Sequence, residues 1–172
     1  MDKIRFNFKN QLAEIKLPAI IGIINNTIDN YFADSRVKSV EQAISKVESM
    51  INDGAAIIDI GAESTRPQST PLTAEEEIER LSSILPHIRK IFPNIIISID
   101  TYHAKTAKYA IDEGADIIND ISSGLMDPEI ITTVANANIP YIAMHMQGTP
   151  STMQINPHYN DVIEEINYFF SE

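Results

Sequence analysis

The residues best suited to chemistry stand where apolar runs of the chain end. They are Asn25 and Thr27, the segment 63–66, Asp100, Asn119, and the pair Met144 and His145. Asp100 and Asn119 supply hydrogen-bond acceptors, and Asn119 also a donor, which suits a flat heterocycle with an amidine-like edge. Arg66 suits an anion such as phosphate. Such side chains indicate a site that binds and positions a substrate more than one that transfers protons.

The sequence lacks the motifs of several other kinds of catalytic or nucleotide-binding site. No Ser-His-acid set, HExxH or cluster of His is visible, so hydrolysis by a protein nucleophile or by bound zinc is not indicated. Neither a GxGxxG nor a P-loop is present, and nothing points to dinucleotide or ATP binding. The absence of Cys excludes disulfides and thiolate catalysis, and it is compatible with a reducing compartment.

Length, composition and charge narrow the class of protein further. The 172 residues, 44% of them hydrophobic, predict a single domain over residues 1–172 with a real core. A formal net charge of -11 argues against binding to nucleic acid or to an anionic membrane. Residues 1–8 alternate charged and apolar side chains and lack the apolar core of a signal peptide. We therefore expect a soluble, cytoplasmic protein.

The elements that must position these residues are five apolar runs that read as buried parallel strands. A strand covered on both faces need not alternate polar and apolar residues, and the runs span residues 19–24, 55–60, 95–100, 115–120 and 140–146. Helical spacing follows each run, over residues 40–51, 73–91, 104–112, from 128, and 159–170. Residues 4–15 read as a short edge strand or hairpin.

Local signals mark where the expected helices begin and end. Ser39 with Gln42, and Thr73 with Glu76, have the spacing of capping boxes. Asp127 and Pro128 read as a cap and a first helical residue. Pro86 lies inside the second helix and should kink or divide it.

Segments 53–59 and 113–119 repeat the order acid, Gly, Ala, any residue, Ile, Ile, Asp or Asn, which predicts a repeated joint between a helix and a strand.

Five strands, each followed by a helix and by polar residues, suggest a (β/α)₈ barrel. A whole barrel takes about 250 residues, however, and an open flavodoxin-like sheet fits five strands better, so the pattern alone leaves the two folds nearly equal. In either fold the carboxyl ends of parallel strands are where ligands bind, so we take Asp100 as a site candidate. The alternative is that Asp100 only caps the helix that follows it.

The motifs together resemble dihydropteroate synthase of the pterin-binding family. The segments that carry the resemblance are 22–29, 59–67, 98–101, 117–121 and 144–150. The resemblance implies a (β/α)₈ TIM barrel, of which about five βα units are present here. It also implies the family's reaction in folate synthesis, in which p-aminobenzoate displaces pyrophosphate from 7,8-dihydropterin-6-ylmethyl diphosphate, with Mg²⁺, to give 7,8-dihydropteroate. Sulfonamide drugs target this family.

The resemblance also implies roles for individual residues. Asn25 is similar to the family's magnesium and pyrophosphate residue, and Asp29 to an acid that stabilises the pterin methylene cation. Thr65 and Arg66 resemble residues that contact the diphosphate and shape the p-aminobenzoate site. A further set resembles the pterin site, with two binding residues and one that packs near the ring: Asp100, Asn119 and Met144.

The sequence departs from the family pattern in two ways. The family usually has Val at Asn26, Pro at Ile28 and Gly at Ala62. The last three strands, which bring further pterin and anion ligands, have no counterpart. We therefore expect little or no turnover by the isolated chain, and an unstable or aggregating protein because sheet edges are exposed. A homodimer is possible, and so is completion of the barrel by a partner.

Two other functions share part of the pattern. One is a non-catalytic, short pterin-binding module, and the other is the methyltetrahydrofolate-binding domain of a corrinoid methyltransferase, which has the same Asp and Asn pair. The segment 64–67, together with Asn25 and Thr27, favours the synthase.

Three more polar residues near the motifs have ordinary structural interpretations. We expect His145 to be a core residue bonded to backbone and Asp59 to be structural. For Glu63, a structural ion pair is as well supported as a role in the site.

Overall fold

The computed structural model describes residues 3–8, 11–26, 39–62, 71–150 and 152–171. Its centre is a sheet of five parallel strands whose order in space follows their order in the chain. The strands are β3 (Ile20–Asn25), β4 (Ala55–Gly61), β5 (Ile96–Asp100), β6 (Ile117–Asp120) and β7 (Tyr141–Ala143). A flavodoxin-like sheet would change direction between its first strands, whereas a barrel adds each strand beside the previous one. The topology is therefore that of a partial (β/α)₈ barrel.

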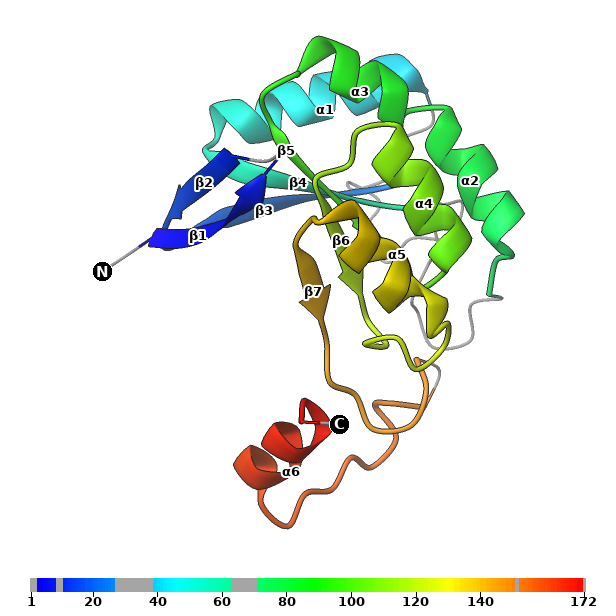
Figure 1. Cartoon of the computed structure of the whole chain (residues 1–172). Helices are drawn as coiled ribbons and strands as arrows, with labels where there is room; N and C mark the ends of the chain where they lie inside the picture. Colours follow the sequence, from blue (N-terminus) through cyan, green and yellow to red (C-terminus); the bar gives the residue numbers. More distant parts are fainter. Residues whose placement is uncertain (1–2, 9–10, 27–38, 63–70, 151, 172) are drawn as a thin grey trace.

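Five helices cover one face of this sheet. They are α1 (Val40–Asn52), α2 (Ala74–Ser82), α3 (Leu85–Ile91), α4 (Ala104–Asp112) and α5 (Glu129–Ala137). They arch over the outer side of the strands, while the last helix, α6 (Val162–Phe169), lies beyond the end of β7 (Figure 1). None of the helices in the described ranges has the length and apolar character needed to cross a membrane.

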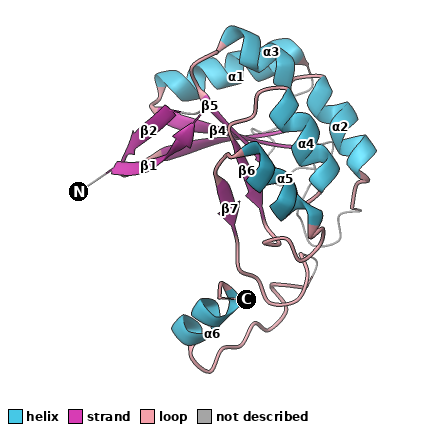
Figure 2. Ribbon diagram, in the orientation of Figure 1, coloured by secondary structure: helices cyan, strands magenta, loops and turns pink. Residues whose placement is uncertain are grey.

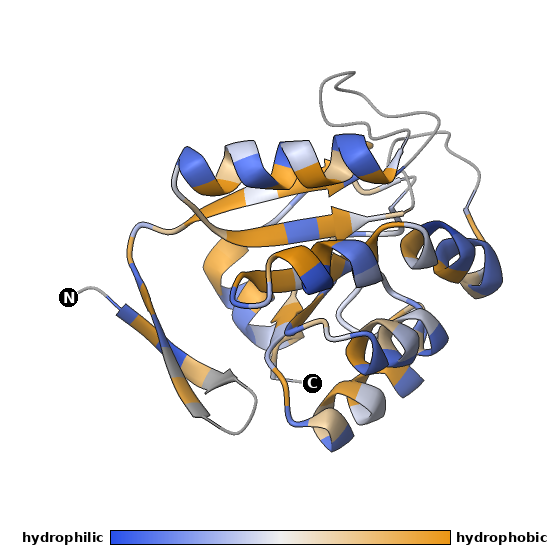
Figure 3. Ribbon diagram, turned by 90° about the horizontal axis from the view of Figure 1, so that it is seen from above, coloured by the Kyte–Doolittle hydropathy of each residue, from blue (hydrophilic) through white to orange (hydrophobic). Residues whose placement is uncertain are grey.

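The core lies between the helices and the outer face of the sheet. The strand residues that point to the helices are completely buried: Ile24, Ile58, Ile60, Ile97, Ile99 and Ile118. From the helices, Val47, Leu81, Leu85, Ile88 and Ile130 pack into the same cluster. The helices turn their hydrophobic sides toward the strands and their polar sides outward (Figure 3). This one-sided burial is what a (β/α) unit requires.

Within the described residues, the hairpin before the sheet covers the amino-terminal end of its inner face. The strands β1 (Lys3–Phe8) and β2 (Gln11–Lys16) form an antiparallel hairpin beside the sheet (Figure 2). Ile15 of this hairpin packs with Ile57 and Ile117 on the inner face. Nearer the edges, Ile23 and Ile142 remain 52% and 38% exposed. The hairpin predicted over residues 4–15 is confirmed, with the strands one residue longer at each end.

The helix boundaries follow the local signals with small shifts. The capping box of Thr73 and Glu76 is complete, and Ser39 accepts a hydrogen bond from the backbone N–H of Gln42. Pro86 does divide the predicted helix, because it lies in the first turn of α3, where its missing N–H costs no bond. The helix after Asp127 begins at Glu129, one residue later than predicted.

The predicted end of the last strand and the predicted start of the last helix were both wrong. The last strand was expected over residues 140–146, but β7 ends at Ala143 because β6 offers it only three partners, the last of them Asp120. The last helix was expected from residue 159 and begins at Val162, where the carboxylate of Asp161 accepts two backbone N–H groups. The cap, rather than the apolar spacing, sets its start.

The repeated joint at 53–59 and 113–119 is confirmed. Gly54 and Gly114 have φ of +99° and +95°, a conformation that residues with a Cβ rarely adopt. Each follows a helix and leads into a strand, β4 in one case and β6 in the other. The equivalent conformations explain why the same residue order recurs.

Candidate functional site at the strand ends

Four residues at the carboxyl ends of neighbouring strands share one layer. Asn25 pairs with Gly61, Gly61 with Asp100, and Asp100 with Asn119 in the parallel register. Residues in register on adjacent strands point to the same face of a sheet. The inner face therefore gathers an amide, a carboxylate and a second amide around a glycine, as the apolar runs predicted.

Because Gly61 has no side chain, the side-chain oxygens of Asn25 and Asp100 can lie close to its backbone. A Cβ at position 61 would lie 3.0 Å from Oδ1 of Asn25 and 3.6 Å from Oδ2 of Asp100. The two oxygens thus flank the space that a side chain would fill. Sequence reasoning had treated this glycine only as part of a motif, whereas its lack of a side chain opens the centre of the layer.

A buried acid lies one layer below. Asp59 precedes Gly61 by two residues on the same face, and its Oδ2 accepts a hydrogen bond of 3.3 Å from Nδ2 of Asn119. Burial raises the pKa of the Asp59 carboxyl, and the hydrogen bond from Asn119 offsets part of the rise. Oδ1 of Asp59 and Oγ of Ser98 have no hydrogen-bond partner among the described residues.

Asp59 was expected to be structural, and its hydrogen bond gives it a further role at the candidate site. Its carboxylate is not simply part of the core, because it holds the amide of Asn119 from beneath the layer. The spacing of two residues between Asp59 and Gly61 in a strand was the signal available from the sequence, since alternate residues share a face.

A second buried acid orders the loop that follows Asn119. The carboxylate of Asp120 is fully buried and accepts four hydrogen bonds: from the backbone N–H groups of Ser122 and Gly124, from the Ser122 hydroxyl, and from the Tyr141 hydroxyl. Burial and this carboxylate strongly raise the pKa of the Tyr141 hydroxyl, which therefore stays protonated as a donor. Sequence analysis had not singled out Asp120 or Tyr141 for this role.

The helix after Asp100 is capped by another residue. The N-cap position of α4 is His103, whose side chain makes no capping bond, and the backbone N–H of Ala104 donates to Oδ2 of Asp127 over 2.7 Å. The alternative interpretation, in which Asp100 serves as the cap of α4, is therefore wrong. Thr101, next to Asp100, donates its hydroxyl to the buried Glu77 over 2.7 Å.

The remaining predicted residues fall into two groups. Asp29, Thr65 and Arg66, together with Glu63, lie outside the described residues. Met144 is described: its backbone N–H donates to the carbonyl of Asp120, which places it directly after β7.

The expectation that His145 bonds to backbone is not supported by the contacts of its ring. The ring packs edge-on against Phe169 with centroids 4.8 Å apart, and Nδ1 lies 3.5 Å from the Tyr159 hydroxyl. His145 therefore contacts the segment before α6 and α6 itself.

Hard oxygen donors are present for a metal ion, but the described part of the chain does not form a closed cage of protein ligands. Within the described ranges, no group of three or more His, Cys, Asp and Glu side chains could hold one. Asn25 Oδ1 and Asp100 Oδ2, on either side of the Gly61 gap, are oxygen ligands of the kind that Mg²⁺ accepts. Mg²⁺ usually takes one or two protein oxygens and completes its shell with water and substrate phosphates. The residues fit such an open site.

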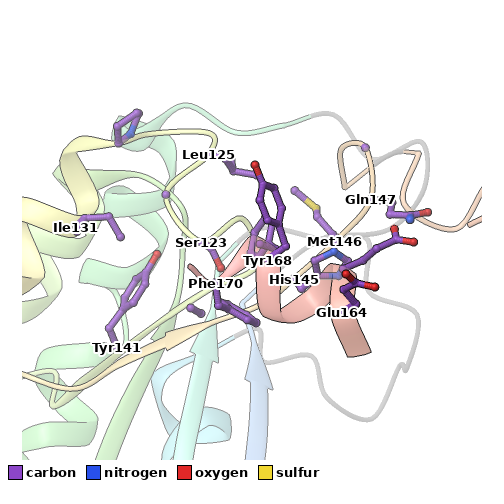
Figure 4. Close-up of a pocket in the computed structure, with 16 residues that line it drawn as sticks. Ser123, Leu125, Ile131, Tyr141, His145, Met146, Gln147, Glu164, Tyr168 and Phe170 are labelled. Carbon is purple, nitrogen blue, oxygen red and sulfur yellow. The ribbon is translucent and has the colours of Figure 1, made fainter. Parts of the chain in front are cut away.

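A large hollow lies elsewhere, between α5, β7 and α6. It measures about 1050 Å³, and Leu125, Tyr141, His145, Tyr168 and Phe170 are among the residues around it (Figure 4). Tyr141 and Ala143 flank Ile142, which is in register with Asn119. The hollow therefore contacts the opposite face of the strand from the candidate site, and it is a separate feature.

Comparison with known proteins agrees with this arrangement. The family model "Pterin binding enzyme" matches residues 21–172. The mitochondrial folate synthesis bifunctional protein of Arabidopsis thaliana is 42% identical over 151 residues, which are 86% of this chain and 27% of that protein. The Yersinia pestis dihydropteroate synthase, crystallised with a sulfonamide drug complex, superposes with a TM-score of 0.85 at 31% identity, covering 98% of this chain and 60% of that one.

The Burkholderia cenocepacia dihydropteroate synthase in complex with 7,8-dihydropteroate gives a TM-score of 0.78 at 34% identity. The superposition includes 99% of this chain and 57% of that synthase. The chain thus spans less than two thirds of the relatives it matches.

Proposed function

Because the chain belongs to the pterin-binding enzyme family, we propose that its strand ends form the pterin-binding part of a dihydropteroate synthase site. The reaction would join 7,8-dihydropterin-6-ylmethyl diphosphate to p-aminobenzoate, giving 7,8-dihydropteroate and pyrophosphate. The observation that carries the proposal is the layer of Asn25, Gly61, Asp100 and Asn119, with two oxygens facing the Gly61 gap. The homologous synthase with bound 7,8-dihydropteroate supports the choice of ligand.

The chemistry of the layer suits the flat edge of a pterin. Asp100 offers a carboxylate, and Asn119 an amide whose orientation is fixed by its hydrogen bond to Asp59. A fixed pair of this kind selects a ring with donors and acceptors on adjacent atoms, because unmatched polar groups would be left buried. Met144, directly after β7, is proposed to pack near the ring.

The proposed reaction breaks the bond between the pterin methylene carbon and the diphosphate oxygen, and the diphosphate departs with the electron pair. The amine nitrogen of p-aminobenzoate forms the new bond to carbon and then loses a proton. In this scheme Asp29 stabilises positive charge on the methylene group, while Thr65 and Arg66 contact the diphosphate. Asp100 and Asn119 hold the pterin so that the methylene carbon meets the amine.

Asn25 is the residue proposed to hold Mg²⁺ together with the diphosphate. The ion would neutralise negative charge on the leaving group.

Calorimetric titration with 7,8-dihydropterin-6-ylmethyl diphosphate tests the pterin site. We expect the wild-type chain to bind the ligand and Asp100→Asn to weaken binding about 10- to 100-fold, since a hydrogen bond to a charged group contributes about 1.5–3 kcal/mol. The control is Asp112→Asn, which changes an exposed acid paired with Lys108 on α4. Equal affinities for wild type and Asp100→Asn would contradict the proposed site.

Pyrophosphate release dependent on p-aminobenzoate tests catalysis separately. We propose that the chain alone gives little or no turnover, because the barrel ligands expected from later strands have no counterpart in it. Binding without release is therefore the expected result, and a non-catalytic pterin-binding module would give it too. Release dependent on p-aminobenzoate would contradict the expected lack of turnover and exclude the non-catalytic module. A chain that binds methyltetrahydrofolate instead of the diphosphate ligand would support the methyltransferase alternative.

A further inference from the structure

Helix α2 makes three contacts with the ends of three different strands. Oε2 of Glu77 accepts from the hydroxyl of Thr101 over 2.7 Å. Nη1 of Arg80 donates to the carbonyl of Ala62 over 2.9 Å. The carbonyl of Arg80 accepts from Nδ2 of Asn26 over 2.8 Å. Glu77 and Arg80 are three residues apart and therefore lie on one side of the helix.

Each strand residue held by α2 directly follows a residue of the inner layer. Asn26 follows Asn25, Ala62 follows Gly61, and Thr101 follows Asp100. Successive residues of an extended chain point to opposite sides. Helix α2 therefore forms hydrogen bonds with the three residues that directly follow Asn25, Gly61 and Asp100 of the candidate site.

The contact between Glu77 and Thr101 is shielded from water, and the two contacts of Arg80 are partly shielded, which strengthens them. Glu77 and Thr101 are 1% and 2% exposed, and Ala62 is completely buried. Backbone hydrogen bonds link the same positions across the sheet: the N–H of Asn26 donates to the carbonyl of Gly61 over 2.8 Å, and that of Thr101 to the carbonyl of Asn119 over 3.0 Å. Polar contacts that exclude water hold their geometry more rigidly than exposed ones.

We propose that Glu77 and Arg80 form a clamp that fixes the spacing of Asn25, Gly61 and Asp100, and so sets the affinity of the strand-end site for a pterin. The two residues are positioning residues, because they act through the strand ends without touching the ligand. The proposal rests on the proposed function for the identity of the ligand. The fixed spacing of the strand ends does not depend on it.

One arm of the clamp depends on the side chain of Asn26, whose Nδ2 donates to the carbonyl of Arg80. Val at this position could not make that hydrogen bond. Asn26 also donates to Oγ of Ser83 over 3.2 Å. Asn26→Val therefore removes this arm with a residue that favours extended chain, and Arg80→Met removes the second arm while keeping a good helix former.

Native-state hydrogen exchange measures the clamp without a ligand. In both Asn26→Val and Arg80→Met we expect the protection factor of the backbone amide at position 26 to fall about 10-fold, because the strand end opens locally. The control is Thr73→Ala, which removes the N-cap of the same helix and leaves the three contacts intact. Protection at position 26 that is unchanged in the two clamp variants, or equally lowered in the control, would overturn the proposal.

Titration with the pterin diphosphate then measures the consequence for the site. We expect the dissociation constant to rise about 10-fold in the two clamp variants and to change less than about twofold in Thr73→Ala, since small misplacements of positioning groups are costly. Lost protection with an unchanged dissociation constant would refute the positioning role. If the wild-type chain binds no pterin, the proposed function fails, and hydrogen exchange alone decides whether the clamp exists.

Discussion

The variant Gly61→Ala tests ligand binding at the strand ends separately from the stability of the fold. The new methyl group would enter the gap between the side-chain oxygens of Asn25 and Asp100, 3.0 Å and 3.6 Å from them. The first distance is shorter than ordinary carbon–oxygen contact, so the Asn25 side chain must move by a few tenths of an ångström. The backbone of Gly61 lies in a regular strand, where Ala is tolerated at least as well as Gly.

Two effects of opposite sign act on the stability of this variant. Ala in a strand gains about 0.5–1 kcal/mol over Gly through the lower entropy of the unfolded chain. The contact with Asn25 costs a similar amount, because an amide at the end of a strand can turn away. We therefore expect the free energy of unfolding to change by less than about 1 kcal/mol, which shifts Tm by at most about 2–4 °C in a domain of this size.

Ligand binding should respond much more strongly. The methyl group fills the centre of the layer and displaces an oxygen that faces the ligand. We expect the dissociation constant for the pterin diphosphate to rise by about 10- to 100-fold, in line with the cost of misplacing a positioning group.

Gly54→Ala is the matched control, because Gly54 has a φ of +99° and no atom within 4 Å of an added Cβ. It should cost about 1 kcal/mol of stability and leave binding unchanged. Thermal melts and titrations of both variants give the test. If Gly61→Ala loses stability without losing affinity, the layer does not bind the ligand.

Three further predictions concern buried polar groups, the first at the amino ends of the strands and the others near the site. Arg89→Met leaves the buried carboxylate of Asp116 without its ion pair and should lower the free energy of unfolding by about 3–5 kcal/mol in a urea titration; a loss below 1 kcal/mol would contradict the role of this pair. Tyr141→Phe removes one of the four hydrogen bonds to Asp120 and should cost about 1–2 kcal/mol. Tyr159→Phe, whose hydroxyl lies 3.5 Å from Nδ1 of His145, should cost less than about 0.5 kcal/mol. Because the folded pKa of Asp59 is raised, the folded state binds its proton more readily than the unfolded state, so the cost of burying this carboxylate is present at neutral pH and is relieved as pH falls through the raised pKa. Asp59→Asn should therefore be more stable than wild type at pH 7, and denaturant titrations should show the difference shrink toward pH 4; a constant difference would show that the Asp59 carboxyl is not perturbed.

The strands and most helices could be predicted because local chemistry determines them. Runs such as 55–60 and 95–100 are apolar enough to be buried on both faces, and Thr73 with Glu76 caps its helix through neighbouring atoms. The choice between a barrel and an open sheet could not be made from pattern alone, since it depends on which strands lie side by side. The resemblance to dihydropteroate synthase favoured the barrel, and the strand order agrees with it.

The contacts that were missed join residues far apart in the sequence. Asp127 caps α4 from 23 residues away, and Asn119 bonds to Asp59 across 60 residues. No spacing rule links such pairs, because the fold alone brings them together. The end of β7 was missed for a related reason: the length of a strand is limited by its partner, and β6 is short. The strand-end layer itself was predictable, because parallel strands place their carboxyl ends at one edge.

The most direct test of the pterin site follows the side-chain amide signals of the asparagines by NMR while 7,8-dihydropterin-6-ylmethyl diphosphate is added. Asn25 and Asn119 lie in one layer, so their Nδ2 signals should shift together with the same dissociation constant. Asn138, an exposed residue at the carboxyl end of α5, serves as the internal control and should not shift. Shifts confined to residues around the hollow beside α6, or none at Asn25 and Asn119, would contradict the assignment of the strand ends as the pterin site.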